Sequence, residues 1–429
     1  MQTRLARTTC YSSLKLANML STQTHWPTVH CQHQVTRANS QYLLLPWLFA
    51  VLMLWGCSSS ATAAPTELND KQVAELLESP TTFIDAHIRE DFDFAGLANY
   101  YQAISYYRVA KESIEPITGN QQQLLEQQHW LAIVGRFKVL LINAPTLSLK
   151  INEEQPQLAL PAATDAPRTR AVVAYKHQLP ALATALVPGQ SFALDHLRYA
   201  HLWTPLAWLT KQVEAVLVSI QSHLVSNWGW AIVVLAVAIK LLLLPLSIKT
   251  VGYQRQVSHI QAQLAPKLTA IKARYDGEEA HNQLMAAHRA LGVSPFYSLK
   301  PLMGTLVQLP ILIAVFNALA EMPQLGGQSF LWVSNLAYPD QLASLGQAIP
   351  LFGSSVSLLP LLMTLIALCS TVVFKNRYAE ITEIKRQKRN LYLMAALFFV
   401  LFYPFPAAMV LYWLSANALH AIQQQWVKI

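Results

Sequence analysis

Charged residues are scarce in this chain: only 13% of its 429 residues are charged, whereas 53% are hydrophobic. An ordinary soluble domain carries about 25% charged residues, so this composition favours a membrane protein. Cysteine is also rare. Four cysteines (Cys10, Cys31, Cys57 and Cys369) form no CxxC pair and no Cys/His ligand spacing, which indicates neither a disulfide framework nor a zinc site.

Catalytic and nucleotide-binding motifs are missing from the sequence. It contains no P-loop, and its apolar segments contain no Ser/His/Asp or paired-carboxylate arrangement. We therefore expect no enzymatic activity, no cofactor and no metal. The net charge of +8 does not favour a nucleic-acid substrate, because the bases flank the apolar segments instead of alternating with stacking aromatic residues.

The amino terminus resembles an export signal. An apolar run at residues 42–56 follows a polar, basic stretch and is too short to span a membrane. Residues 54–57 (Leu-Trp-Gly-Cys) resemble a bacterial lipobox, which predicts that residues 1–57 are the signal and that Cys57 is lipidated. Cleavage after Ala63 is the alternative.

Residues 58–202 are predicted to form a small extracytoplasmic, mainly helical domain. Residues 99–109 and 121–141 carry apolar residues at helical spacing. Residues 145–190 contain several prolines and short apolar runs, which indicate loops and short strands. No catalytic motif is recognisable in this part of the chain.

Residues 203–429 read as an all-α, polytopic membrane region. An amphipathic helix over residues 203–226 is expected along the outer membrane interface. Two prolines in Pro404-Phe405-Pro406 divide the last apolar segment into a tight hairpin of two short helices. Five spans follow from the apolar runs: residues 228–248, 301–320, 356–374, 391–403 and 407–422.

The charges of the connecting loops predict the orientation of these spans. Residues 249–300 carry seven Lys and Arg and residues 375–389 carry six, whereas residues 321–355 carry none. Since cytoplasmic loops are enriched in Lys and Arg, the first two loops are predicted to be cytoplasmic. Residues 58–200 then lie outside the cytoplasm, in agreement with the export signal.

The cytoplasmic segment 250–300 is predicted to be a helical hairpin. Apolar residues follow one stripe of its first helix, and Asp276-Gly277 marks the turn. Because this stripe is thin, we expect the hairpin to be mobile and to receive the substrate.

One cation lies inside an apolar span. Lys240 interrupts residues 228–248, and a lysine at that depth costs about 2.5–3.5 kcal/mol on insertion scales. A charge kept at this cost indicates a functional site. The alternative is snorkelling, in which the flexible side chain of Lys240 carries its ammonium group to the headgroups.

Several motifs in residues 203–425 resemble, in order, those of the YidC-type membrane protein insertases of bacteria. They are Asn227-Trp228-Gly229, Lys240 through Pro245-Leu246, Gln263 through Lys267, Gly292 through Pro295, Gln308 through Ile311, Phe330 through Asp340, and Leu411 through Asn417. In that family the intramembrane cation is normally arginine, and here it is lysine.

The resemblance implies a five-helix insertase core that encloses a hydrated, cationic groove in the inner membrane, with the outer domain in the periplasm. It implies that Lys240 lies in the groove, together with a polar lining of Gln308, Asn317, Tyr412, Ser415 and Asn417. Hydrogen bonding between helices is the alternative role of these polar residues. The implied partners are nascent membrane proteins, membrane lipids and, in addition, the Sec translocon and the ribosome, although the chain shows no basic carboxy-terminal tail.

Two other functions compete with insertase and chaperone activity. An anion-binding transporter or channel subunit would also use Lys240, but such proteins more often show repeated halves or paired broken helices. A lipid-modifying enzyme would need catalytic residues that the spans do not show.

Overall fold

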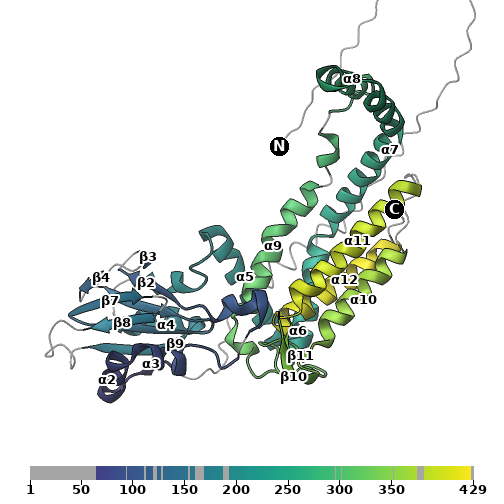
Figure 1. The fold of residues 1–429 in the computed structure, drawn as a ribbon. Coiled ribbons are helices and arrows are strands. Elements are labelled where there is room, and N and C mark those ends of the chain that lie inside the picture. Colours follow the sequence, from purple (N-terminus) through teal and green to yellow (C-terminus); the bar gives the residue numbers. More distant parts are fainter. Residues whose placement is uncertain are drawn as a thin grey trace, which may run out of the picture. The chain divides into compact units, whose positions relative to one another are not determined.

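The computed structural model describes residues 64–92, 94–110, 113–118, 123–126, 129–152, 155–159, 169–186, 193–294, 296–300, 302–350, 352–373 and 381–426. All of them belong to one compact unit, residues 42–429. The predicted signal sequence and the predicted lipidation at Cys57 lie outside the described residues. Within them, a sheet-rich part is followed by a helical part (Figure 1).

The sheet-rich part contains two antiparallel sheets. Neighbouring strands of the larger sheet pair in the order β1-β9-β6-β5-β2-β3, and those of the smaller sheet in the order β4-β7-β8. The larger sheet consists of β1 (Thr66–Glu67), β2 (Ser105–Val109), β3 (Ile114–Pro116), β5 (Trp130–Val134), β6 (Lys138–Asn143) and β9 (Arg170–Tyr175). The smaller sheet consists of β4 (Gln123–Glu126), β7 (Thr146–Asn152) and β8 (Gln155–Ala159).

The prediction of a mainly helical domain at residues 58–202 is wrong. Residues 99–109 form the end of a 3-10 helix and strand β2, and residues 121–141 contain β4, β5 and most of β6. Leu131 and Ile133 of β5 enter one core, whereas Ala132 and Val134 enter another on the opposite face. Because both faces are buried, the strand reads as a continuous apolar run, which cannot be told from a buried helix by periodicity.

Short helices complete the sheet-rich part. Asn69 caps the first of them by accepting a hydrogen bond from the backbone N–H of Gln72, and the Gln72 side chain accepts one from the Asn69 N–H in return. The strands β7, β8 and β9 confirm the short strands predicted for residues 145–190. The helices are α2 (Asp70–Glu78), α3 (Pro80–His87), η2 (Gly96–Gln102), η4 (Lys176–Gln178), α4 (Leu179–Leu186) and η5 (Ala193–Leu197).

The helical part follows the predicted order of helices. In Figure 1, α10, α11 and α12 lie side by side, and α12 also packs against α6. The helices are α5 (Thr204–His223), α6 (Trp228–Leu242), α7 (Leu244–Arg274), α8 (Gly277–Ala290), η6 (Tyr297–Leu299), α9 (Leu302–Glu321), η7 (Pro323–Leu325), α10 (Leu358–Val373), α11 (Ile381–Phe402) and α12 (Ala407–Trp426). A hairpin of β10 (Ala343–Ile349) and β11 (Gly353–Val356) lies between α9 and α10.

The first predicted span is bent. Helix α6 ends at Leu242, and α7 begins at Leu244 with an angle of 56° between them. Pro245 explains the break, because its nitrogen has no hydrogen and its ring clashes with the preceding turn of a continuous helix. The span predicted at residues 228–248 therefore consists of α6 and the start of α7.

Other helix boundaries follow the proline and glycine signals. Helix α11 ends at Phe402 and α12 begins at Ala407, which confirms the turn predicted from Pro404-Phe405-Pro406. The hairpin predicted for residues 250–300 is confirmed as α7 and α8, with Gly277 at φ +60° in the turn. Judged by length and composition, none of the described helices could cross a bilayer alone, whereas the bent pair α6 and α7 together could.

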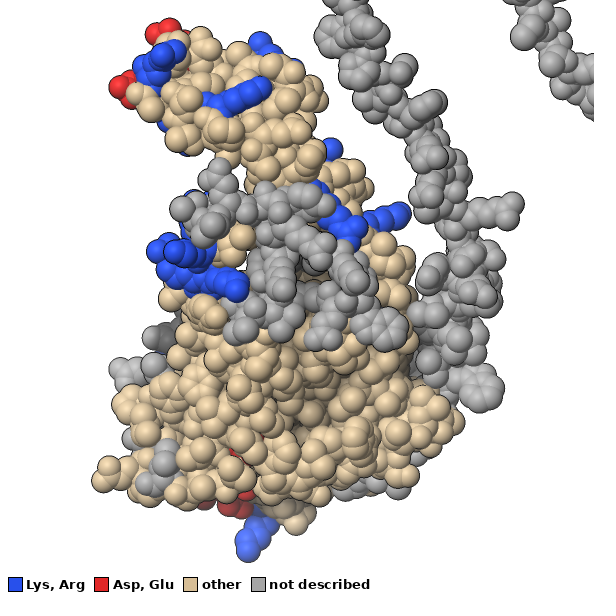
Figure 2. Space-filling model, turned by 90° about the vertical axis from the view of Figure 1, so that its right-hand side faces the viewer, with Lys and Arg blue, Asp and Glu red and all other residues tan. Residues whose placement is uncertain are grey.

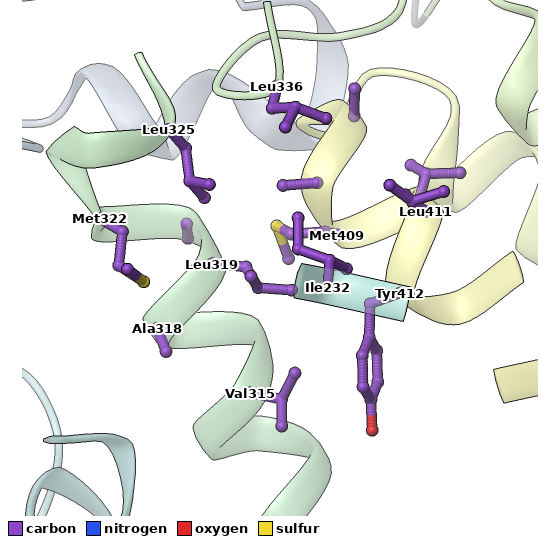
Figure 3. Close-up of a cluster of buried hydrophobic side chains, with 14 of the residues drawn as sticks. Ile232, Val315, Ala318, Leu319, Met322, Leu325, Leu336, Met409, Leu411 and Tyr412 are labelled. Atoms are coloured by element: carbon purple, nitrogen blue, oxygen red, sulfur yellow. The ribbon is translucent and has the colours of Figure 1, made fainter. Parts of the chain in front are cut away.

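The main core joins the helices to the loop that follows α9. Ile232 of α6, Leu319 of α9 and Met409 of α12 point toward one another in Figure 3, whereas the hydroxyl group of Tyr412 points away from them. Gly229 of α6 packs directly on the ring of Phe330, so that a larger residue would force one of them to move. This contact joins two of the recognised motifs, Asn227-Trp228-Gly229 and Phe330 through Asp340.

Asp340 organises the same loop. Its buried carboxylate accepts hydrogen bonds from the backbone N–H groups of Leu358 and Leu359, at 2.7 and 2.8 Å, and from the Trp332 indole at 3.1 Å. An acidic side chain at a helix N-terminus satisfies unpaired N–H groups and favours the helix dipole. Asp340 therefore attaches the loop to the start of α10.

Candidate functional site

A cavity of about 410 Å³ lies among α6, α7, α9 and α12. Its polar lining comes from all four helices, and none of its described lining residues is Asp or Glu. Lys240 is thus a cation with no carboxylate beside it in the cavity wall. The polar and charged residues of the wall are Lys240, Ser247, Thr250, Gln254, Gln308, Tyr412, Asn417, His420 and Gln423.

The bend at Leu243 determines the position of Lys240. Since α6 stops at Leu242, Lys240 lies in its last turn. The C-terminal end of a helix carries partial negative charge, which stabilises a cation by about 0.3–1 kcal/mol. The bend therefore places Lys240 at a favourable helix end and beside the cavity at the same time.

His420 is a polar partner of Lys240. The Lys240 Nζ atom lies 3.3 Å from Nδ1 of His420 on α12. His420 was not among the predicted lining residues. A signal was present, since Trp413, Asn417 and His420 recur at intervals of four and three residues, which places them on one face of a helix.

The residues predicted for the lining divide into two groups. Lys240, Gln308, Tyr412 and Asn417 line the cavity together. Asn317 and Ser415 are not among its described lining residues: Asn317 Nδ2 donates to the Ile313 carbonyl at 2.8 Å, and Ser415 Oγ donates to the Leu411 carbonyl at 2.8 Å. Both of these hydrogen bonds lie within a single helix, so they do not correspond to the alternative of hydrogen bonding between helices. Asn317 Oδ1 also lies 2.9 Å from Nε2 of His201, in the segment before α5.

The region that contains the cavity is similar to known proteins. A family model described as "60Kd inner membrane protein" matches residues 220–429, which include every residue of the cavity wall. A membrane protein insertase YidC from Herminiimonas arsenicoxydans is 30% identical over 348 residues, covering 78% of this chain and 57% of the relative. Residues 220–429 therefore match the family of 60Kd inner membrane proteins, and the chain is similar to YidC insertases.

Other members of the YidC family match over shorter stretches. YidC from Syntrophobacter fumaroxidans is 33% identical over 204 residues, which cover 47% of this chain and 34% of the relative. The matched stretches thus span from about a third to little more than half of the length of these curated relatives. A crystal structure of an active YidC insertase with its first transmembrane domain resolved is 16% identical and covers 77% of this chain and 72% of that one. Its TM-score of 0.37 is too low to establish a shared fold.

A second cavity, of about 480 Å³, lies among α10, α11 and α12 in the region that matches the family model. Its wall is mainly apolar, with residues such as Ile366, Leu391 and Phe398. Both cavities share Trp413, Asn417 and His420 of α12. This face of α12 therefore forms part of the wall of each cavity.

A buried arginine joins the sheet-rich part to the helices. Arg136, between β5 and β6, donates from Nε to the Ala320 carbonyl at 2.7 Å and from Nη2 to the Ala337 carbonyl at 2.8 Å. Its guanidinium group also lies within 5.0 Å of the ring centres of Phe94, Tyr101 and Phe137. Burial lowers the pKa of Arg136 to about 10, which leaves the group charged at neutral pH.

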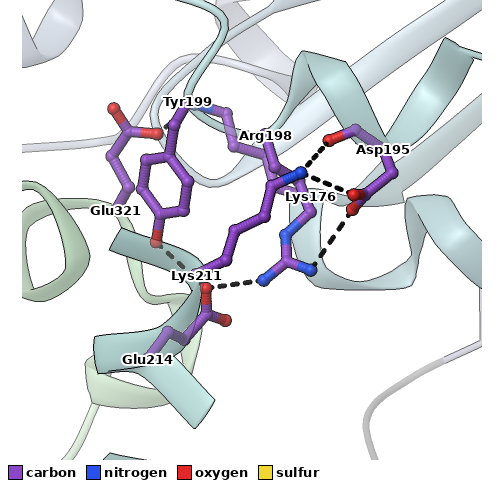
Figure 4. Close-up of polar contacts among 7 residues, drawn as sticks. All are labelled: Lys176, Asp195, Arg198, Tyr199, Lys211, Glu214 and Glu321. Carbon is purple, nitrogen blue, oxygen red and sulfur yellow. Dashed lines mark hydrogen bonds and ion pairs between the residues drawn. The ribbon is translucent and has the colours of Figure 1, made fainter. Parts of the chain in front are cut away.

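A network of ion pairs, drawn in Figure 4, lies near the same end of α9. Lys176 Nζ donates to Glu321 at 2.7 Å, and Arg198 Nη2 donates to Glu214 at 2.6 Å. Burial alone would lower the pKa of Arg198, but the Glu214 carboxylate raises it above its ordinary value. Burial and the same carboxylate raise the pKa of Tyr199, whose hydroxyl donates to Glu214 at 3.0 Å. Lys176 and Glu321 thus join η4 to the end of α9, and Arg198 and Glu214 join the turn after η5 to α5.

Proposed function

We propose that this chain is a membrane protein insertase and chaperone of the bacterial inner membrane. The single observation that carries the proposal is Lys240, a cation with no carboxylate among the described residues of its polar cavity, in the region that matches the family model. We propose α6, α9, α10, α11 and α12 as the five helices of the core. Nascent membrane proteins are the proposed substrates, with the Sec translocon and the ribosome as further partners.

The surface of the helices supports placement in a membrane. Figure 2 shows basic side chains gathered at the α7–α8 hairpin and at one end of the helices, whereas most of the visible face below them carries no charge. Leu306 of α9, Leu365 of α10 and Leu393 and Leu397 of α11 are each more than half exposed. Large exposed apolar patches mark surfaces that are covered by lipid or by a partner. With the basic loops in the cytoplasm, the sheet-rich part would lie in the periplasm.

The cavity supports a simple mechanism. A hydrated, positively charged cavity lowers the cost of bringing a polar or acidic segment into the membrane, because water and Lys240 replace part of its hydration. The apolar helix of the substrate then partitions into lipid, and the burial of its side chains drives the step. The process makes and breaks no covalent bond.

The test compares two variants of Lys240 with two substrates. Insertion into proteoliposomes is measured for one substrate with an acidic translocated tail and for the same substrate with a neutral tail. Lys240→Ala should lower insertion of the acidic tail roughly tenfold, which corresponds to loss of about 1.4 kcal/mol of attraction, and should affect the neutral tail much less. Lys240→Arg should retain activity because it keeps the charge.

The matched control removes a lysine outside the cavity. Lys385 is exposed on α11 and does not belong to the cavity wall, so Lys385→Ala should insert both substrates normally. Wild-type rates for both substrates in the Lys240→Ala variant would contradict the proposed role of the cavity and favour snorkelling.

A further inference from the structure

We propose that His420 is a positioning residue that holds the Lys240 ammonium group in the cavity. This inference rests on the proposed function, because it names the residue that makes the cation of the cavity available to substrate. It starts from one contact, the 3.3 Å separation between Lys240 Nζ and His420 Nδ1.

The chemistry of this contact determines the roles of its atoms. An ammonium group has three donors and no acceptor, so Nδ1 of His420 must supply the lone pair. The proton of the neutral ring then lies on Nε2. A doubly protonated ring would set a donor against a donor and a positive charge against a positive charge, and the contact would be lost.

The neutral acceptor explains how the charge can be oriented without being cancelled. A carboxylate in the place of His420 would bind Lys240 more strongly, but it would also neutralise the charge. The described wall of the cavity holds no Asp or Glu. An imidazole lone pair orients the ammonium group and leaves its full charge for an acidic segment of the substrate.

The side chains of Lys240 and His420 differ in conformational freedom. Lys240 has a flexible stem of four carbons and lies in the last turn of α6, from which it could extend toward the end of the helix. His420 has two rotatable side-chain bonds and belongs to α12, which packs against α6 and α10. Ordering the histidine therefore costs less entropy than ordering the lysine, so His420 is the fixed member of the pair.

The position of His420 on α12 adds a second, geometric reason. His420 belongs to the face of α12 that lines both cavities, together with Trp413 and Asn417. A hydrogen bond to His420 draws the ammonium group toward this shared wall. The charge then lies next to the polar cavity and near the mainly apolar one.

The experiment measures where the ammonium group lies, independently of insertion activity. The full chain in proteoliposomes is treated with a membrane-impermeant, amine-acylating reagent, and acetylation of Lys240 is followed by mass spectrometry. Three proteins are compared: the wild type, His420→Phe, which keeps a ring but removes the acceptor, and His420→Asn, whose amide oxygen lies near the place of Nδ1. Lys385 serves as the internal reference in every sample.

We expect Lys240 to react at least about fivefold faster in His420→Phe than in the wild type. Loss of a hydrogen bond from a charged donor shifts the equilibrium between the bound and the released ammonium group by about this factor. His420→Asn should restore slow labelling, and Lys385 should react equally in all three proteins. His129→Phe, in the sheet-rich part of the chain, should leave the labelling of Lys240 unchanged.

Equal labelling of Lys240 in the wild type and in His420→Phe would overturn the inference. Equal acceleration in His420→Phe and His420→Asn would also overturn it, because ring packing and not the acceptor would then hold Lys240. If the phenylalanine variant does not fold, His420→Leu takes its place with the same expected result. The same preparations are tested for insertion: faster labelling with normal insertion of the acidic tail would refute the role of the positioned cation in insertion, while the contact between the two residues stands. Absence of insertion by the wild-type protein would refute the proposed function, whatever the labelling shows.

Discussion

Two cations, Arg136 and Lys240, occupy opposite kinds of surroundings in this molecule. Arg136 is 5% exposed, donates to two backbone carbonyls and lies against three aromatic rings. Lys240 borders a cavity of about 410 Å³ and lies 3.3 Å from a histidine ring nitrogen. A cation held by backbone carbonyls and aromatic rings stabilises a structure, whereas one that borders a cavity is available to a ligand.

The side chains suit these different roles. The planar guanidinium group of arginine donates in several fixed directions and stacks on aromatic rings, so it can join the Ala320 carbonyl, the Ala337 carbonyl and the ring of Phe137 at once. The ammonium group of lysine is a compact, strongly hydrated point charge on a flexible stem. Arg136 therefore acts as a structural connector, and Lys240 suits a hydrated site.

The largest expected effect is on the stability contributed by Arg136. Arg136→Ala should lower the free energy of unfolding by about 3 kcal/mol, because the Ala320 and Ala337 carbonyls lose charged donors and the aromatic rings lose their cation. Thermal unfolding of the purified chain in lipid nanodiscs measures this loss. Arg170→Ala is the control, since the exposed pair of Arg170 and Glu67 should contribute at most about 1 kcal/mol. Equal losses in both variants would mean that Arg136 contributes no more to stability than an exposed ion pair does.

The opposite result is expected for Lys240. Lys240→Leu should leave the free energy of unfolding unchanged or raise it by about 1–3 kcal/mol, because it removes a costly charge from an apolar segment. The same variant should lose insertion of acidic tails, as Lys240→Ala does. Stability and insertion are measured on one preparation in nanodiscs and proteoliposomes. A destabilisation as large as that of Arg136→Ala would remove the contrast between the two cations.

The smallest expected effects belong to Ser415, which bonds within its own helix. Ser415→Ala should change the free energy of unfolding by less than about 1 kcal/mol, because its hydroxyl donates only to the Leu411 carbonyl four residues earlier in α12. Insertion of acidic and neutral tails should both stay at the wild-type rate. A selective loss of acidic-tail insertion would show that Ser415 acts in the cavity after all.

The comparisons between residues also indicate how much of the site can be read from the sequence. The cost of a lysine in an apolar run selects Lys240 directly, and the family motifs add Gln308, Tyr412 and Asn417, which the structure brings together. His420 and Arg136 were not selected. The partners of Lys240 and Arg136 are distant in sequence: Lys240 and His420 are separated by 180 residues, and Arg136 and Ala320 by 184.

The sequence by itself determined the features that depend on neighbouring residues. Pro404-Phe405-Pro406 ends one helix and starts another, Asp276-Gly277 turns the hairpin, and Lys240 is costly in its own segment whatever surrounds it. Each of these effects acts within a few residues of the chain, so a local pattern is sufficient to predict it.

Only the tertiary structure decided the sheets and the environment of each cation. Residues 130–134 are buried on both faces, so the choice between helix and strand depended on pairing with residues 105–109 and 138–143. Likewise, only the packing of α12 against α6 decides that Lys240 meets His420 beside a cavity. Hydrogen bonds between distant segments and the shape of a cavity depend on how the whole chain packs, and no local pattern contains that information.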